Sequence, residues 1–173
     1  MKEKFNTIRR SPDLSAAIAA GLIAGTIMML LQLAMYPLFF DRSAWFHPRL
    51  IAAIPLGQDV LPNVSSGPDA GVAFAALLAH YVLSVIYAVI ASVVLDRVRF
   101  WSAVTLGAVG GFALYLINYY GFTNVFEWFA ASRDWVTTFT HISFGVGTAA
   151  AYKALERPQR LIHTERMPAL HHP

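Results

Sequence analysis

Four long stretches of the chain contain no Asp, Glu, Lys or Arg, and each is rich in aliphatic and aromatic residues. They cover residues 14–40, 70–95, 100–126 and 135–152, so each has at least 18 residues. An α-helix rises about 1.5 Å per residue, and about 20 apolar residues therefore cross the hydrocarbon core of a bilayer. Inside lipid, backbone polar groups need partners within the segment, which favours helices over strands. The pattern predicts an all-α membrane protein, a bundle of four transmembrane helices.

The charged residues between these stretches set the expected organisation. A basic N-terminus over 1–13 precedes a four-helix transmembrane domain over 14–155, and a polar tail over 156–173 follows it. The expected helices cover about 14–40, 70–95, 100–120 and 135–155, joined by long connections at 41–69 and 121–134.

The basic residues are distributed unevenly between the two sides of such a bundle. With the N-terminus inside, three of the 13 basic residues lie outside, and these are Arg42, Arg49 and Arg133. The other ten fall in cytoplasmic segments: Lys2, Lys4, Arg9, Arg10, Arg97, Arg99, Lys153, Arg157, Arg160 and Arg166. Positive charge favours the cytoplasmic side. The sequence therefore predicts cytoplasmic termini, with 41–69 and 121–134 as outer loops.

Both outer loops contain apolar segments that are too short to cross a membrane. One covers 48–55, where Pro48 suits the first turn of a helix. The other covers 124–133 and contains Phe126, Trp128 and Phe129. We expect two short interfacial segments, the first of them an interfacial or re-entrant helix.

The composition narrows the classes of function. Hydrophobic residues make up 57% of the 173 residues and charged residues 13%, with a mean hydropathy of +0.52, which excludes a disordered chain. There is no cysteine, which excludes a disulfide scaffold and a Cys-ligated metal. The net charge of +3 arises at chain ends and short connections, so nucleic acid is not an expected partner. No motif places a nucleophile beside a base, and no enzyme is predicted.

Small residues recur at four-residue spacing on the expected helices. Such faces let two helix backbones approach closely in a membrane. They account either for packing within one bundle, which we favour, or for contact between two subunits. The glycines concerned are Gly21, Gly25, Gly107, Gly111 and Gly147.

The most polar side chains of the expected helices fall in the outer half of the membrane. At 1.5 Å per residue from the helix ends, Gln32, His80, Asn118 and His141 all lie there. Arg133 could rim the same region from the second outer loop. These groups either tie helices together, at about 0.6 kcal/mol for each hydrogen bond, or line a pocket that opens outward.

Two imidazoles on different helices also meet the minimum for a six-coordinate haem b. The ligands would be His80 and His141, but their expected depths differ by about 5 Å, one helical turn. We therefore expect no cofactor and no metal, with haem b as the alternative.

Four short segments carry a resemblance to known proteins. They are Ala20–Thr26, His80-Tyr81, Asn118–Tyr120 and His141–Gly145. Together they resemble segments of the YagU-like proteins, small four-span inner-membrane proteins of bacteria with no defined activity. The resemblance implies a location in the bacterial inner membrane.

These features predict a multi-pass inner-membrane protein without catalytic activity. It would act as an accessory or partner-binding subunit, and its polar pocket would hold a small lipid-like or quinone-like ligand. Two alternatives stay open: a haem b- or quinone-linked electron-transfer subunit, and a small oligomeric transporter of a solute or ion. The spans contain no carboxylate, which disfavours the transporter. The lipid bilayer is an expected partner, with a homo-oligomer or a larger membrane complex left open.

Overall fold

The structure, a computed structural model, describes residues 11–63 and 67–157. All regular structure in these ranges is helical, which confirms the predicted all-α class. Its α-helices are α1 (Leu14–Phe40), α2 (Phe46–Leu56), α3 (Ala70–Leu95), α4 (Phe100–Leu116) and α5 (Trp135–Leu155). Shorter helical turns cover Gln58–Val60, Ile117–Gly121, Phe122–Asn124 and Glu127–Ser132. Most of the predicted N-terminal segment and polar tail lies outside the described residues.

An aspartate stands directly before three of the long helices and fixes where each begins. Asp13, Asp69 and Asp134 precede α1, α3 and α5, and each side chain accepts a hydrogen bond from the backbone N–H three residues later. Such a cap satisfies one of the N–H groups that a helix start leaves without a partner.

The capping carboxylate of α1 is held in its charged form. Hydrogen bonds from the Ser15 hydroxyl and from the backbone N–H groups of Ala16 and Arg157 lower the pKa of Asp13 from 3.8 to about 2. The carboxylate is therefore charged at neutral pH, as suits the positive end of a helix dipole.

Three helical segments are long and apolar enough to span a membrane. They are Leu14–Phe40, Ala70–Leu95 and Phe100–Asn124, the last of which joins α4 to the two turns that follow it. Only 17% of the most apolar stretch in each of the last two is buried inside the protein. Uncovered apolar surface of this extent needs an apolar solvent. The fold is thus compatible with an integral, multi-pass membrane protein.

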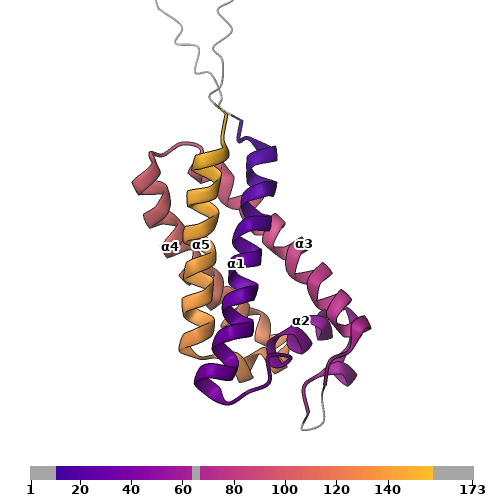
Figure 1. Ribbon diagram of the computed structural model, residues 1–173. Helices are drawn as coiled ribbons and strands as arrows, with labels where there is room; N and C mark the ends of the chain where they lie inside the picture. The colour runs from indigo at the N-terminus through magenta and orange to yellow at the C-terminus, as the bar shows by residue number, and fades with distance from the viewer. Residues whose placement is uncertain (1–10, 64–66, 158–173) are drawn as a thin grey trace, which may run out of the picture.

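The fifth helix, α5, is not among these three although it has 21 residues. Its buried side chains include Thr137, Thr140, His141 and Thr148. Figure 1 shows α5 between α1 and α4, and it packs extensively on both. These polar side chains therefore face other helices. Their presence lowers the hydropathy of α5, which explains why it is not among the three segments.

The four long helices leave a gap on one side of the bundle, and α2 fills this gap. In Figure 1, α1, α4 and α5 run side by side, while α3 leans away from them toward its N-terminal end. The short α2 fills the resulting gap: Ala52 packs against Ala75 of α3, and Leu50 packs against Tyr115 and Tyr119. The apolar segment predicted at 48–55 is therefore a helix, and it packs into the bundle with Leu50, Ala52 and Ala53 buried.

Gly21 and Gly111 each allow a close contact between two helices. A Cβ atom added to Gly21 would lie 2.9 Å from the backbone oxygen of Ser84, so α1 and α3 approach closely there. A Cβ atom added to Gly111 of α4 would overlap the backbone oxygen of His141 of α5.

The third close contact involves a glycine that the spacing argument did not select. Gly107 of α4 faces Gly145 of α5, and a Cβ atom on either would overlap the backbone oxygen of the other. Gly147, which the spacing argument selected, faces Ala24 instead, and a Cβ atom added to Gly147 would lie 3.4 Å from that of Ala24, an ordinary contact distance.

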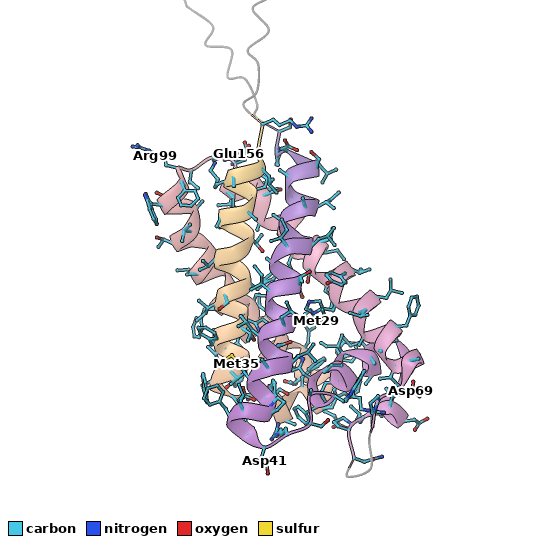
Figure 2. All side chains as sticks on the ribbon, in the orientation of Figure 1. Met29, Met35, Asp41, Asp69, Arg99 and Glu156 are labelled. Atoms are coloured by element: carbon cyan, nitrogen blue, oxygen red, sulfur yellow. The ribbon has the colours of Figure 1, made fainter. Side chains whose placement is uncertain are left out.

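Charged residues gather at the two ends of the bundle. Figure 2 shows Arg99 and Glu156 at one end, the Glu156 end, and Asp41 and Asp69 at the other, the Asp41 end. The first and last described helices are tied together at the Glu156 end. The backbone N–H of Asp13 donates to the Tyr152 hydroxyl at 3.1 Å, and that of Arg157 donates to the Asp13 carboxylate at 3.2 Å.

Candidate functional site

A cavity of about 220 Å³ is lined by residues of all five α-helices and of the turns after α4. Four of its lining residues are phenylalanines, and no lining residue carries a formal charge. The polar lining residues are Gln32, His47, His80, Ser84, Tyr87, Asn118, Tyr119 and His141. The cavity thus combines neutral hydrogen-bonding groups with aromatic surface.

Four of the five residues predicted for a polar pocket line this one cavity. Gln32 comes from α1, His80 from α3, Asn118 from the turn after α4, and His141 from α5. The structure therefore brings together side chains that are far apart in the sequence.

His47 of α2 lies at the centre of one hydrogen-bond cluster. Its Nε2 atom lies 2.9 Å from the Tyr119 hydroxyl and 3.3 Å from Nε2 of Gln32, which also donates to Thr140 at 3.3 Å. An amide nitrogen can only donate, so the ring nitrogen of His47 accepts and the imidazole is neutral. Burial, together with the neighbouring His141 and His80, lowers the pKa of His47 from 6.5 to about 3.

Asn118 connects three helices through a second chain of hydrogen bonds. The Tyr87 hydroxyl donates to its Oδ1 atom at 3.0 Å, and its Nδ2 atom lies 3.5 Å from Nε2 of His141. The Nδ1 atom of His141 lies 2.8 Å from the backbone oxygen of Thr137, which can only accept. His141 therefore carries its proton on Nδ1, and its Nε2 accepts from Asn118.

A π-helical turn positions Asn118 and Tyr119 together. It covers Ile117–Gly121 and continues directly from α4. Adjacent residues of an α-helix point about 100° apart, and the wider turn lets these two line the same cavity. Such turns occur frequently at functional sites.

His80 contacts α1 through a glycine. Its Nε2 atom lies 2.9 Å from the backbone oxygen of Gly25, so this nitrogen donates. A Cβ atom at Gly25 would lie 2.7 Å from the Ser84 hydroxyl and 3.4 Å from Nε2 of His80. Glycine at this position therefore allows α3 to bring His80 close to the backbone of α1.

Arg133, predicted at the rim of the pocket, is not among the residues that line the cavity. Its Nε atom donates to the backbone oxygen of Tyr119 at 2.7 Å, and Nη2 donates to the Thr123 hydroxyl at 2.8 Å. Its guanidinium also lies 4.5 Å from the centre of the Tyr120 ring. Arg133 thus ties the turn after α4 to the segment before α5, and the cavity lining contains no charged residue.

The polar lining does not suit the haem alternative. Haem iron would take the Nε2 atoms of His80 and His141 as ligands, yet Nε2 of His80 lies 2.9 Å from the backbone oxygen of Gly25 and Nε2 of His141 lies 3.5 Å from Nδ2 of Asn118. Within the described residues, no group of three His, Cys, Asp or Glu side chains is placed to hold a metal ion.

Sequence reasoning missed His47 and expected Tyr119 only at the rim of the pocket, not in its lining. A signal for His47 was present, because His47, Ile51 and Ile54 recur at helical spacing and all three line the cavity. Pro48 and Pro55 instead suggested a short segment at the periphery of the bundle, so this spacing was not used. For Tyr119 the sequence holds no comparable signal, because its inward direction depends on the π-helical turn.

Comparisons with known proteins identify no relative: no model of a protein family, no curated protein and no solved structure matches the chain. The resemblance to the YagU-like proteins therefore stays a prediction.

Proposed function

We propose that the chain is a four-span protein of the bacterial inner membrane, like the YagU-like proteins that it resembles, and that both of its termini lie in the cytoplasm. In this proposal α5 is the fourth span, and its polar residues are shielded by α1 and α4. Two observations support it: the hydrogen bonds that tie Asp13 to Tyr152 and Arg157 at one end of the bundle, and the excess of basic residues in segments assigned to that side. The Asp41 end is then the outer end.

Cysteine labelling tests whether α5 crosses the membrane. The chain has no native cysteine, so Ala130→Cys and Arg157→Cys, at exposed positions on either side of α5, can be labelled without background. We expect an impermeant thiol reagent to label position 130 in intact spheroplasts, and position 157 only after lysis. Labelling of both positions in intact cells would show that α5 does not cross.

We further propose that the protein binds a small, uncharged, lipid-like or quinone-like ligand and acts as an accessory or partner-binding subunit without catalytic activity. The convergence of Gln32, His47, His80, Asn118 and His141 on one cavity carries this proposal. Interhelical bonding needs only pairs of polar groups, whereas five such residues around a shared space provide a binding surface. Because the lining is uncharged, a charged ligand would be buried without a counter-charge.

A ligand that binds only the folded state raises stability by about 2.7 kcal/mol at a concentration of 100 times Kd. We therefore expect bacterial lipid extract to raise the melting temperature of the delipidated protein by about 5–10 °C. Asn118→Leu should abolish most of this rise. Thr26→Val is the matched control, because it removes a hydrogen bond between α1 and α3, to Tyr81 at 2.9 Å, outside the cavity. Equal rises in all three proteins would contradict a ligand role for the cavity.

A further inference from the structure

The polar cavity continues into a larger apolar groove. This groove, of about 500 Å³, lies between α3 and α4 and has part of α5 as its floor. Tyr87, Leu114 and Phe144 line both spaces, so the two adjoin each other. The groove extends from this junction past Ile90 and Val109 to Leu95 and Leu106, near the turn that joins α3 to α4.

The groove exists because α3 and α4 diverge. The two helices meet at the turn over 96–99, and Figure 1 shows α3 running away from α4 beyond it. On the floor, Gly107 and Gly111 bring α4 close to α5, and both glycines line the groove. On the other side of the junction the space is closed by α2 and by Phe122, Phe126 and Phe129.

The two spaces differ in chemistry. Eight polar side chains line the cavity, whereas the groove is lined almost entirely by aliphatic side chains and glycine. Neither lining contains Asp, Glu, Lys or Arg. An uncharged polar region joined to a long apolar one matches an amphiphile with a neutral head and a long hydrocarbon chain.

We infer that the cavity and the groove together bind one isoprenoid quinone, with its ring in the cavity and its prenyl chain in the groove. This inference rests on the proposed function and names the ligand class. A quinone ring is planar and offers carbonyl oxygens as acceptors. The Asn118 amide has two N–H groups, of which the bond to His141 uses one. The phenylalanines offer aromatic faces and edges for the ring to pack against.

The absence of charge separates this ligand from the abundant membrane lipids. The phosphate of a phospholipid or the carboxylate of a fatty acid would be buried without a cation to pair with, at a cost of several kcal/mol. Hydrocarbon chains of the bilayer can enter the groove, but their head groups do not suit the cavity. The matched occupant of both spaces is therefore a neutral amphiphile.

The Tyr87 side chain marks the junction between ring and chain. Its hydroxyl bonds Asn118 across the gap between α3 and α4, at 3.0 Å, and its ring lines both spaces. The bilayer and the groove are equally apolar, so moving a hydrocarbon chain from one to the other yields no hydrophobic free energy. The binding free energy of the chain therefore comes mainly from packing. The ring should therefore provide specificity, and the chain should add affinity only where the groove is free.

Gly110 allows the groove to be filled without disturbing the fold. It lines the groove, and a Cβ atom added there has no neighbour within 4 Å. Gly110→Phe places an aromatic ring in the path of the chain, and Gly110→Leu is a milder second variant. Leu77→Trp is the matched control. It enlarges an exposed side chain in a different apolar pocket, between α1, α2 and α3, which also adjoins His80.

The probes are menaquinone with a four-isoprene chain and menadione, which has the same ring without the chain. Binding to the detergent-solubilised full chain is measured by separating bound from free quinone and assaying the bound quinone by its ultraviolet absorption. We expect Gly110→Phe to weaken menaquinone binding about tenfold and to leave menadione binding unchanged. Leu77→Trp should change neither, and Asn118→Leu should weaken both.

The outcomes separate this inference from the proposed function. If Asn118→Leu weakens both probes while Gly110→Phe and Gly110→Leu weaken neither, the cavity binds the ring but the groove assignment is wrong. Loss of menaquinone binding in Leu77→Trp alone would place the chain in the other pocket and also overturn it. If phosphatidylglycerol displaces menaquinone at equal concentration, the uncharged head is wrong. If Asn118→Leu changes neither probe, the proposed site itself fails.

Discussion

We expect Gly111→Ala to lower the melting temperature of the detergent-solubilised protein by about 2–12 °C. The single added Cβ atom would overlap the backbone oxygen of His141, so α4 and α5 must move apart. Overpacking of this kind costs about 1–3 kcal/mol, and about 2–4 °C are lost for each kcal/mol in a protein of this size. A rigid backbone on the opposing helix leaves no flexible side chain that could relieve the overlap.

The neighbouring glycine provides the control. Gly110→Ala adds the same methyl group to the same helix, where no atom lies within 4 Å. Both changes raise the helix propensity of α4 equally, so their difference reports the α4–α5 contact. We expect Gly110→Ala to be neutral or slightly stabilising. If the two variants melt at the same temperature, the close contact between α4 and α5 is wrong.

His47→Ala should have a comparable effect through a different cause. It leaves the Tyr119 hydroxyl and the Gln32 amide without their shared acceptor in a buried place, where His47 itself is 4% exposed. An unsatisfied buried donor costs about 1–3 kcal/mol. We expect the double variant His47→Ala, Tyr119→Phe to lose less than the sum of the two single changes, because one stranded donor is then removed. Additive losses in melting temperature would show that the two side chains do not interact.

The same residue gives stability a predictable dependence on pH. The pKa of His47 is about 3 in the folded protein and 6.5 for a free imidazole. As pH falls below about 6.5, the unfolded chain binds a proton that the folded protein does not, so stability decreases toward acid pH. His47→Gln keeps an acceptor but cannot titrate, and it should melt with a smaller decrease between pH 7 and pH 5. An equal decrease in wild type and variant would place the titrating groups elsewhere.

The long helices could be predicted from the sequence because their signal is local. Charge-free runs mark α1, α3 and α4, and an aspartate directly before a run fixes the start of α1, α3 and α5. The position of α2 was beyond this reasoning. Depth estimated from 1.5 Å per residue applies to a helix that crosses the membrane, and it cannot place a segment that packs back into a gap left by a tilted neighbour.

In the candidate site too, residues with a local sequence signal could be predicted, and residues placed by the three-dimensional packing could not. Gln32, His80, Asn118 and His141 were selected because polar groups inside apolar runs are costly and need a partner or a function. Arg133 was selected for its place in the outer loop above the helices, but its side chain bonds the backbone oxygen of Tyr119 and does not line the cavity. Direction of this kind depends on the conformation of the turns after α4, which the residue pattern does not encode.

The central claim is that the polar cavity holds a ligand and does more than join helices. Native mass spectrometry of the protein released directly from bacterial membranes tests it. We expect the wild type and the Thr26→Val control to carry an additional mass of a neutral lipid-like molecule, and Asn118→Leu to lack that mass while remaining folded. The same bound molecules on all three proteins would contradict the claim and leave the polar residues with a purely structural role.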